Sequence, residues 1–542
     1  MASERRSCPC WWHDPGVVTR VPEIESKYDV GARCQLPDLA TLAGVASVDR
    51  PQKYTLEAVY LDSVDLRLLA DGVTLRRRTG GADAGWHLKL PAADGARHEL
   101  QLPLEDAAER LDRTEPDDGP AALGRRVPAQ LLGLVRARLR GAEPVPVARL
   151  LTHRVVRQLR DVAGTVLAEV ADDTVTAQVL GSSVTVLTWR EWEVELGPGG
   201  DRRLLAEVGS RLITAGATTA GHGSKLARAL ADRVATQPSR PVHSSTPLHR
   251  RSRAGDVVVA YLAGQVQELR LRDPEVRQDR PDAVHKARVA SRRLRSALRT
   301  YRPLLDREVT DPVGEELGWL AGVLGDVRDA EVMRERLRQL VDSQPDDLVL
   351  GPVLTDVTTE LDRQHREAHE RLVTELDGDR YVALLDRLDA LVTSPPTTPL
   401  AARRADRVLP RQMHRAWQAL EQTVQAALAE QRPDRKDLLL HDARKAAKRV
   451  RYAAESVQAV YGGDAKATAK AVTRVQEELG HHQDSTVARA LLLELARRAG
   501  GNGFTYGRLH ALEQVRGETA AARLPVLWAA ADTNKATRWF TG

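Results

Sequence analysis

The sequence predicts an α+β protein of two domains, in which an antiparallel β domain precedes an all-α helical bundle. Short segments with alternating polar and apolar residues fill residues 20–232, and this period of two is typical of antiparallel strands. Long amphipathic segments of helical period fill residues 254–530. Between them, residues 235–253 are rich in proline, serine and threonine and lack periodicity. We therefore expect a linker at 233–253 that joins two domains with separate cores.

The composition is that of a globular protein whose basic character is local. Of the 542 residues, 29% are charged and 42% are hydrophobic, and the net charge is only +5. The three cysteines, Cys8, Cys10 and Cys34, form neither a disulfide framework nor a complete zinc site. No apolar run reaches the roughly 18 residues of a membrane span, and residues 1–19 read as a tail without a signal-peptide core. We expect a cytoplasmic protein with no membrane partner.

The alternating segments of the first domain indicate strands joined by turns. Helical segments are expected near Ala129–Arg140, Asp201–Ala215 and Ser224–Arg233. The expected strands are Val21–Tyr28, Tyr54–Leu61, Val73–Arg78, Gly85–Leu90, Leu151–Leu159, Val166–Ala171, Val184–Leu187 and Trp189–Leu196.

Charged residues occupy alternate positions of several of these strands. Glu23, Glu25 and Lys27 share one side of the first strand, and the three glutamates of Glu191–Glu195 share one side of the last. For any single strand, a solvated outer face is the simpler interpretation, because charged side chains are mostly exposed. A closed barrel would instead collect all of them in one polar interior. Carboxylates together with arginine and lysine suit Mg²⁺ or Mn²⁺ bridging to phosphate oxygens.

The segment Glu23–Lys27 has the ExExK pattern, and the region around it resembles the CYTH superfamily of triphosphate tunnel metalloenzymes. The other matching segments follow in the family's order and span nearly all of residues 20–232. They are Tyr60-Leu61-Asp62 with Leu66-Arg67-Leu68, Leu75–Arg78, Trp86–Lys89, Glu99, the strand of Arg154, Asp172-Asp173, Glu191–Glu195 and Ser224-Lys225.

This resemblance implies an antiparallel eight-stranded tunnel that binds a triphosphate with Mg²⁺ or Mn²⁺ and hydrolyses a phosphoanhydride. Two points stay open: Asp172 against Asp173 as the inward carboxylate, and whether Glu99 or Glu195 faces the interior. By position, the resemblance implies metal ligands at Glu23, Glu25, Asp173, Glu191 and Glu193, and catalytic residues at Glu23, Glu25, Lys27, Arg76, Arg78, Lys89, Arg154 and Lys225, the basic ones as phosphate ligands.

Two basic stripes mark the second domain. Each has side chains at offsets of 0, 3, 7 and 10, which at roughly 100° per residue lie within an arc of about 80° on one helix face. The first stripe is His285, Arg288, Arg292 and Arg295, and the second is His441, Arg444, Lys448 and Arg451.

The stripes favour an external anion. From His285 to Arg302 there are seven lysines and arginines and no acid, whereas a salt-bridged surface helix mixes both signs. The alternative is a solvated basic face paired with acids on other helices. Nucleic acid is a competing partner, but single-stranded recognition usually adds aromatic stacking, and the stripes offer only Tyr301 and Tyr452 at their ends. A polyanion without bases fits better.

The second domain also reads as a duplication. The run Ser394–Pro399 divides it, and in each half a similar box follows the stripe, Leu324–Asp329 in the first and Leu479–Asp484 in the second. Two markers in the same order indicate a repeated helical unit. We place the halves at about 254–393 and 401–530, with a C-terminal tail at 531–542.

The stripes and boxes resemble the CHAD domain, a histidine-marked α-helical module that often follows a CYTH domain. The resemblance implies two antiparallel four-helix repeats related by a pseudo-two-fold axis, with a basic surface for inorganic polyphosphate. The residues it implies for polyphosphate binding are His285, Arg288, Arg292, Arg295, Arg299, His441, Arg444, Lys448 and Arg451.

The two resemblances together predict an enzyme of phosphate metabolism. Its tunnel is expected to hydrolyse inorganic triphosphate, and its helical domain to hold polyphosphate. Three alternatives remain at this stage. In the first, the tunnel hydrolyses a nucleoside or thiamine triphosphate. In the second, the tunnel is a cyclase that acts on ATP. In the third, the chain is a non-enzymatic protein of polyphosphate granules with a weak or regulatory tunnel.

Overall fold

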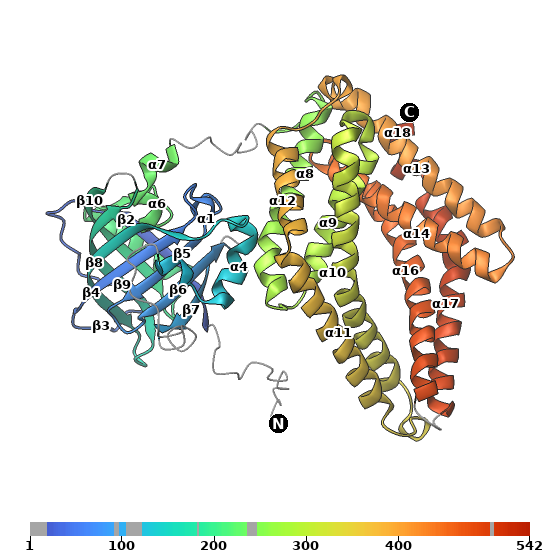
Figure 1. The fold of residues 1–542 in the computed structure, drawn as a ribbon, viewed down its shortest axis with the longest axis horizontal. Helices are drawn as coiled ribbons and strands as arrows, with labels where there is room; N and C mark the ends of the chain where they lie inside the picture. The colour runs from blue at the N-terminus through green and yellow to red at the C-terminus, as the bar shows by residue number, and fades with distance from the viewer. Residues whose placement is uncertain are drawn as a thin grey trace. The chain divides into compact units, whose positions relative to one another are not determined.

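The structure is a computed structural model that describes residues 19–91, 97–104, 122–181, 184–235, 247–498 and 503–541. The chain divides into two units, Met1–Ser239 and Arg240–Gly542 (Figure 1). The first is built on an antiparallel sheet and the second is helical, so the predicted fold class is confirmed. Among the described residues, no helix combines the length and the apolar character that crossing a membrane requires.

The first unit contains one long antiparallel sheet. Its expected strands Val184–Leu187 and Trp189–Leu196 prove to be one strand, because pairing with the neighbouring strand continues through Thr188. The strands are β1 (Thr19–Glu23), β2 (Glu25–Asp29), β3 (Ser47–Val48), β4 (Gln52–Asp62), β5 (Thr74–Thr79), β6 (Gly85–Pro91), β7 (Arg97–Pro103), β8 (Val145–Arg160), β9 (Val166–Val179), β10 (Thr185–Leu196) and β11 (Thr218–Thr219).

The sheet closes on itself into a barrel. Its strand order is β1-β7-β6-β5-β4-β8-β9-β10-β2-β11, and only Ile24 separates β1 from β2. Because β1 pairs with β7 while β2 pairs with β10, this interrupted first strand joins the two ends of the sheet. With β1 and β2 taken as one strand, and with the two-residue β3 and β11 set aside, eight strands of the described residues form the barrel, the number that the resemblance implies, although β7 was not among the strands expected from alternation.

Apolar side chains of the strands pack outward under short helices, so the charged side chains of opposite parity face inward. On β6, Trp86 and Leu88 pack outward against Leu131 of the helix that follows β7. On β10, Trp192 packs outward against Val208. These helices are α1 (Arg67–Ala70), α3 (Ala122–Arg125), α4 (Ala129–Leu139), α5 (Arg202–Thr214), α6 (Lys225–Ala229) and α7 (Ala231–Ala235).

Asp62, part of one family-like motif, has a structural role. Its buried carboxylate accepts hydrogen bonds from the backbone N–H groups of Ser63, Leu68 and Leu69 at 2.7, 2.8 and 2.8 Å. Burial raises the pKa of Asp62 to about 6, although these N–H donors favour the ionised form. The side chain fixes the turn that leads from β4 into α1.

The second unit consists of two similar halves. Consecutive long helices pack against each other in each half, in the same order, and the third long helix of each half has 36 residues. The first half contains α8 (Ala254–Arg277), α9 (Ala283–Thr300), α10 (Arg307–Asp342), α11 (Val353–Asp377) and α12 (Asp379–Thr393); the second contains α13 (Ala405–Ala429), α14 (Pro433–Ser456), α15 (Gln458–Tyr461), α16 (Gly463–Arg498), α17 (Gly503–Ala531) and α18 (Asn534–Thr541).

Reciprocal contacts relate the halves. At the starts of α8 and α13, Ala254 donates its backbone N–H to Arg403 and Ala405 donates to Ser252, both at 2.8 Å. The two stripe helices, α9 and α14, also pack against each other. The buried Tyr301 hydroxyl at the end of α9 lies 2.6 Å from Ser456 Oγ at the end of α14. The duplication therefore brings equivalent elements together.

One expectation about the chain end is wrong. Residues 531–542 are not a tail outside the domain, since α18 packs against α13 and α16 much as α12 packs against α8 and α10. Ala536 and Phe540, four residues apart on one helix face, are buried in the core of the second half. The small and aromatic residues of this segment pack too well to remain in solvent.

Candidate functional site

The barrel encloses a cavity of about 200 Å³, called the lumen below, and strands on every side of the barrel line it with mostly charged side chains. Many predicted site residues meet there. They are Glu25, Lys27, Arg76, Arg78, Lys89, Arg154, Glu193 and Lys225, accompanied by Tyr60, Asp83, Glu99, Gln101, Glu169 and Glu195.

Three predicted metal ligands form a carboxylate cluster on one wall. Asp173 on β9 lies opposite Glu191 on β10, and Glu193 follows two positions later on the same face. One carboxylate oxygen of each lies within 4.8 Å of the others, and their side chains are at most 11% exposed. Such an oxygen-only donor set fits Mg²⁺ or Mn²⁺.

Lys225, at the first position of α6, binds all three carboxylates. Its Nζ lies 2.9 Å from Asp173, 2.8 Å from Glu191 and 2.7 Å from Glu193. Burial opposes the charge of Lys225, but these carboxylates outweigh burial and hold its pKa above the usual range. The cluster thus has a strong preference for a cation in its midst.

Glu193 is the centre of the charged network. Lys27, Arg154 and Lys225 all contact its carboxylate. Burial alone would raise the pKa of Glu193, but the three cations hold it well below its usual range. Arg154 also makes a bidentate pair with Asp173, at 2.8 and 2.7 Å. Glu193 therefore remains an anion in the closed barrel.

Glu25 lies beside this cluster rather than within it. It faces Glu195 across the β2–β10 pair, and Lys27 bridges it to Glu193, with 2.7 Å between Lys27 Nζ and Glu25 Oε2. Burial raises the pKa of Glu195, and Glu25 and Glu169 add to that shift. Glu23 lies in β1, and its side chain is outside the described residues.

The open choice between Asp172 and Asp173 is resolved by the register of β9. Asp173 is fully buried on the inner side of the barrel wall, where it binds Arg154 and Lys225, two residues that line the lumen. Asp172 points outward and pairs with Arg190 at 2.7 Å. Alternation alone separates these neighbours but does not say which faces inward.

The opposite wall of the lumen is cationic. Arg76 and Arg78 on β5 and Lys89 on β6 all face inward. Arg76 Nη2 lies 3.3 Å from Glu99 Oε1, and Lys89 Nζ lies 3.8 Å from Glu99 Oε2. Burial and the neighbouring Arg76 lower the pKa of Arg78 to about 9. Glu99 thus faces the lumen, as Glu195 does.

Sequence reasoning missed several groups around this wall. Tyr60 accepts a hydrogen bond from Arg76 at 3.2 Å, and Asp83 pairs with Arg78. His87 is buried between Glu99 and the turn that carries Asp83. His87 could have been predicted to face inward, because it lies two positions before Lys89 on the same strand. Asp83 could not, because it lies in a turn, where no periodicity applies.

In the helical unit, the two stripes converge on one cationic cluster. Arg288 and Arg292 from α9 face Arg444 and Lys448 from α14, because the two helices pack against each other. Burial and the three surrounding arginines lower the pKa of Lys448 to about 6. Among the described residues, Arg292 and Lys448 make no hydrogen bond or ion pair. We call these four residues the cationic cluster.

Glycines in the two boxes allow the arginines to lie flat on the neighbouring helices. A Cβ atom at Gly325 of α10 would lie 3.3 Å from Arg288 Nη2, and one at Gly480 of α16 would lie 3.4 Å from Arg444 Nη2. Equivalent arginines thus pack on equivalent glycines in both halves. This contact gives a physical reason for the repeated boxes.

The other stripe residues surround the cationic cluster. His285, Arg295 and Arg299 are exposed on α9. His441 Nδ1 lies 2.7 Å from Gln483, and Arg451 donates to Gln476 at 2.8 Å. Burial and nearby cations lower the pKa values of His285 and His441, so both imidazoles favour the neutral form.

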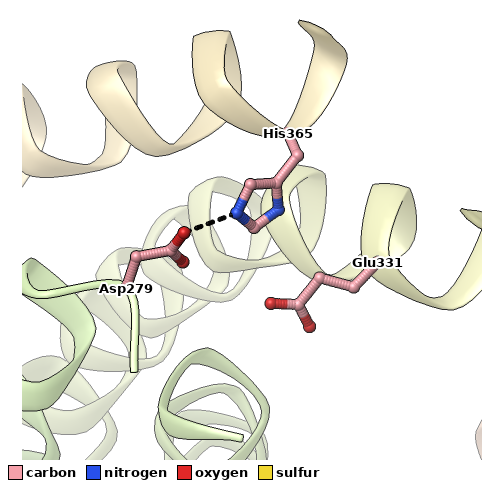
Figure 2. Close-up of side chains that lie close together, drawn as sticks. All are labelled: Asp279, Glu331 and His365. Carbon is pink, nitrogen blue, oxygen red and sulfur yellow. Dashed lines mark hydrogen bonds and ion pairs between the residues drawn. The ribbon is translucent and has the colours of Figure 1, made fainter. Parts of the chain in front are cut away.

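A second group of metal-ligand residue types lies in the helical unit (Figure 2). Asp279 precedes α9, Glu331 lies on α10 and His365 on α11, with one ligand atom of each within 4.8 Å of the others. His365 Nε2 is 2.8 Å from Asp279, and Glu331 pairs with Arg328 at 2.7 Å. Asp279 has a positive φ of 48°. These contacts tie the strained α8–α9 turn to α11, which is a structural role.

Comparison with known proteins matches both units to family models. The CYTH domain model matches residues 21–213, and the CHAD domain model matches residues 260–493. Two proteins from Mycobacterium tuberculosis, "Uncharacterized protein MT2285" (strain CDC 1551 / Oshkosh) and "Uncharacterized protein Rv2226" (strain ATCC 25618 / H37Rv), are each 37% identical over 510 residues, which cover 91% of this chain and 92% of theirs.

Among solved structures, PptA from Streptomyces chartreusis is similar to part of the chain. It is 26% identical, covers 51% of this chain and 100% of its own, and has a TM-score of 0.43. The two domain matches and the near full-length relatives agree with the order of motifs along the sequence. The chain belongs to the family of proteins in which a CYTH domain is followed by a CHAD domain.

Proposed function

We propose that the barrel hydrolyses inorganic triphosphate in a metal-dependent reaction and that the helical unit binds inorganic polyphosphate. The proposal of triphosphate hydrolysis rests on one observation: a carboxylate wall and a cationic wall face each other across one small lumen. A linear triphosphate needs both, since a divalent metal screens some of its charge and basic side chains bind the remaining oxygens.

Each wall has a distinct task in this reaction. Asp173, Glu191 and Glu193 would hold Mg²⁺ or Mn²⁺, which when bound supplies Lewis acidity and activates water at neutral pH. Arg76, Arg78 and Lys89 would bind phosphate oxygens and stabilise the charge that develops on the transferred and leaving groups. Lys27, Arg154 and Lys225 hold Glu193 ionised, and Lys225 contacts all three carboxylates.

The lining of the lumen favours an inorganic substrate over a nucleotide. Its described side chains are mainly ionic, with Tyr60 as the one aromatic ring, and Leu56, Ala58 and Leu150 as small aliphatic surfaces. A nucleobase would need a stacking or apolar platform to be held firmly. The test is phosphate release from tripolyphosphate, ATP and thiamine triphosphate by the intact chain with Mg²⁺ or Mn²⁺. A clear preference for ATP or thiamine triphosphate would contradict the inorganic assignment.

The cationic cluster supports polyphosphate binding. The basic groups of Arg288, Arg292, Arg444 and Lys448 disfavour one another's charged forms. Among the described residues Arg292 and Lys448 form no ion pair, although Asp484 partly offsets the charge at Lys448. Such unbalanced charge in a half-buried position is stabilised by an external anion. A flexible polyphosphate chain can run along both stripes at once. Binding without hydrolysis by the tunnel would favour the alternative of a granule-associated protein.

Polyphosphate binding is expected to take up a proton. In the unbound protein the pKa of Lys448 is about 6, so the amine is mostly neutral at pH 7.5. A bound anion favours the ammonium and raises this pKa toward its ordinary value. The affinity for polyphosphate is therefore greatest below about pH 6, the pKa of Lys448 in the unbound protein. The affinity falls as the pH rises from there to the higher pKa of Lys448 in the complex, and in this range binding takes up as much as about one proton.

Isothermal titration calorimetry in two buffers of different ionisation enthalpy measures this uptake. The apparent binding enthalpies at pH 7.5 should differ between the buffers, and Lys448→Met should remove most of the difference. Equal enthalpies for the unmodified protein would show that no proton is taken up and that Lys448 is already charged.

Adding one methyl group under each stacked arginine is expected to weaken polyphosphate binding. Gly325→Ala and Gly480→Ala place Cβ atoms 3.3 and 3.4 Å from the guanidinium groups, which must shift by a few tenths of an ångström. We expect affinity to fall about threefold to tenfold for the double variant, although alanine favours the helix. Gly322→Ala on α10 is the control, since nothing lies within 4 Å of its added Cβ. If the unmodified protein, the double variant and the control bound polyphosphate with equal affinity, the packing of the two arginines on these glycines would have no role in binding.

A further inference from the structure

One buried titratable pair in the lumen wall has no task in the proposed hydrolysis. His87 on β6 and Glu99 on β7 have side chains that are 1% and 6% exposed. His87 Nδ1 lies 2.8 Å from Glu99 Oε1. On the other side of the ring, His87 Nε2 lies 2.9 Å from the backbone carbonyl oxygen of Asp83. Both ring nitrogens therefore have a fixed oxygen neighbour.

The hydrogen positions follow from these two contacts. A carbonyl oxygen only accepts hydrogen bonds, so Nε2 must carry a hydrogen that it donates to Asp83. A neutral imidazole with its hydrogen on Nε2 presents a lone pair at Nδ1, and an ionised carboxylate presents lone pairs as well. Two lone pairs do not approach to 2.8 Å without a hydrogen between them. We propose that His87 and Glu99 share one proton, so that the pair carries no net charge in the empty lumen.

The surrounding charges act on where the shared proton lies. Arg76 on β5 approaches Glu99 Oε1 at 3.3 Å, and Lys89 on β6 approaches Oε2 at 3.8 Å. Arg78 on β5 also faces the imidazole. Burial lowers the pKa of His87 to about 4, Arg76 and Arg78 add to this effect, and the bond to Glu99 opposes it. Burial thus opposes an imidazolium at His87, while Arg76 and Lys89 favour ionised Glu99, so the case for the shared proton rests on the two short contacts of the ring.

The proton decides how much charge the cationic wall offers to a phosphate. An ionised Glu99 would be a counter-ion to Arg76 and Lys89 and would repel an entering polyanion. A neutral pair leaves both cations uncompensated by Glu99, which favours phosphate binding. His87 is then a positioning residue for the phosphate ligands, a role that rests on the proposed triphosphatase function. Loss of the proton at high pH should raise KM.

Nuclear magnetic resonance of the intact chain without substrate tests the shared proton independently of activity. We expect one strongly deshielded exchangeable proton near pH 7, absent in both His87→Gln and Glu99→Gln. Glutamine at position 87 can still donate to the Asp83 carbonyl but has no counterpart of Nδ1. Absence of the resonance in the unmodified protein, or its persistence in His87→Gln, would overturn the proposal.

Kinetics test the consequence for substrate binding. His87→Gln leaves Glu99 ionised, so KM for tripolyphosphate should rise about tenfold with little change in kcat. Glu99→Gln places an amide that donates to Nδ1 and cannot ionise, so KM should lose its rise at high pH. If both variants instead keep the pH profile of the unmodified protein, the pair does not control binding. A protein that hydrolyses no triphosphate would contradict the proposed function, while the resonance experiment would still decide whether the proton is shared.

Discussion

Glu193→Gln should lower kcat for tripolyphosphate about a thousandfold in the presence of Mg²⁺ or Mn²⁺. Glu193 contributes an oxygen to the carboxylate cluster and contacts Lys27, Arg154 and Lys225. The amide is nearly the same size, but it removes the negative charge that attracts a metal. Steady-state phosphate release at saturating metal measures the effect.

A matched variant separates this effect from general damage to the barrel. Glu57→Gln makes the same change on β4, where the carboxylate lies on the outer face and pairs with Arg149 at 2.8 Å. That pair is partly exposed, and breaking it should change stability by less than about 1 kcal/mol. Activity of Glu193→Gln close to that of Glu57→Gln, with metal affinity unchanged, would exclude the carboxylate cluster as the metal site.

The second large effect is expected in the helical unit. The double variant Arg292→Ala with Lys448→Ala removes the two unpaired members of the cationic cluster and should weaken polyphosphate binding about a hundredfold at low salt. The loss should shrink as the ionic strength rises, because salt screens the remaining attraction. Equilibrium binding of a polyphosphate of fixed length, at several salt concentrations, measures both quantities.

A control with the same change in charge uses cations outside the stripes. Arg371 on α11 and Lys535 on α18 are exposed, and Arg371→Ala with Lys535→Ala also removes one arginine and one lysine. If this control weakened binding as much as the stripe variant, net charge rather than the cationic cluster would hold the polyphosphate. Circular dichroism of both variants checks that the helices remain formed.

Much of the barrel could be predicted because its side chains obey a period of two. The glutamates of Glu191–Glu195 follow that period, as do Arg76 and Arg78 of β5, and the structure places them inward. Closure could not be derived from any single strand, because it depends on the break at Ile24 that lets β1 and β2 pair with strands at opposite ends of the sheet. The roles of Asp83 and His87 also depend on tertiary contacts.

The helical unit shows a similar limit. Spacing places His285 to Arg295 on one helix face, but it does not reveal that this face meets the equivalent face of α14. Burial lowers the pKa of Lys448, and the convergence of the two stripes adds to it by bringing Arg288 and Arg292 close. The repeated boxes were visible in the sequence, whereas their glycines acquire a purpose only when Arg288 and Arg444 are seen to lie on them. The sequence pattern shows which residues share a helix face, whereas tertiary packing determines which residues of other helices surround that face.

Both candidate sites concentrate charge that folding alone would not favour. In the barrel, buried carboxylates and cations offset each other in pairs, as with Arg154 and Asp173. In the helical unit, the charges of Arg288, Arg292 and Arg444 crowd together around Lys448. Paired buried charge is compatible with a stable unit, while crowded like charge lowers stability until an anion binds. Polyphosphate should therefore stabilise the helical unit.

We expect the lumen to bind tripolyphosphate and to cleave its terminal phosphoanhydride bond with the aid of a divalent metal. Phosphorus magnetic resonance of the products formed by the intact chain tests it most directly. We predict orthophosphate and pyrophosphate in equal amounts from tripolyphosphate with Mg²⁺ or Mn²⁺, and neither product when a chelator removes the metal. No product with either metal, or formation of a cyclic nucleotide from ATP as the dominant reaction, would contradict the proposed triphosphatase function.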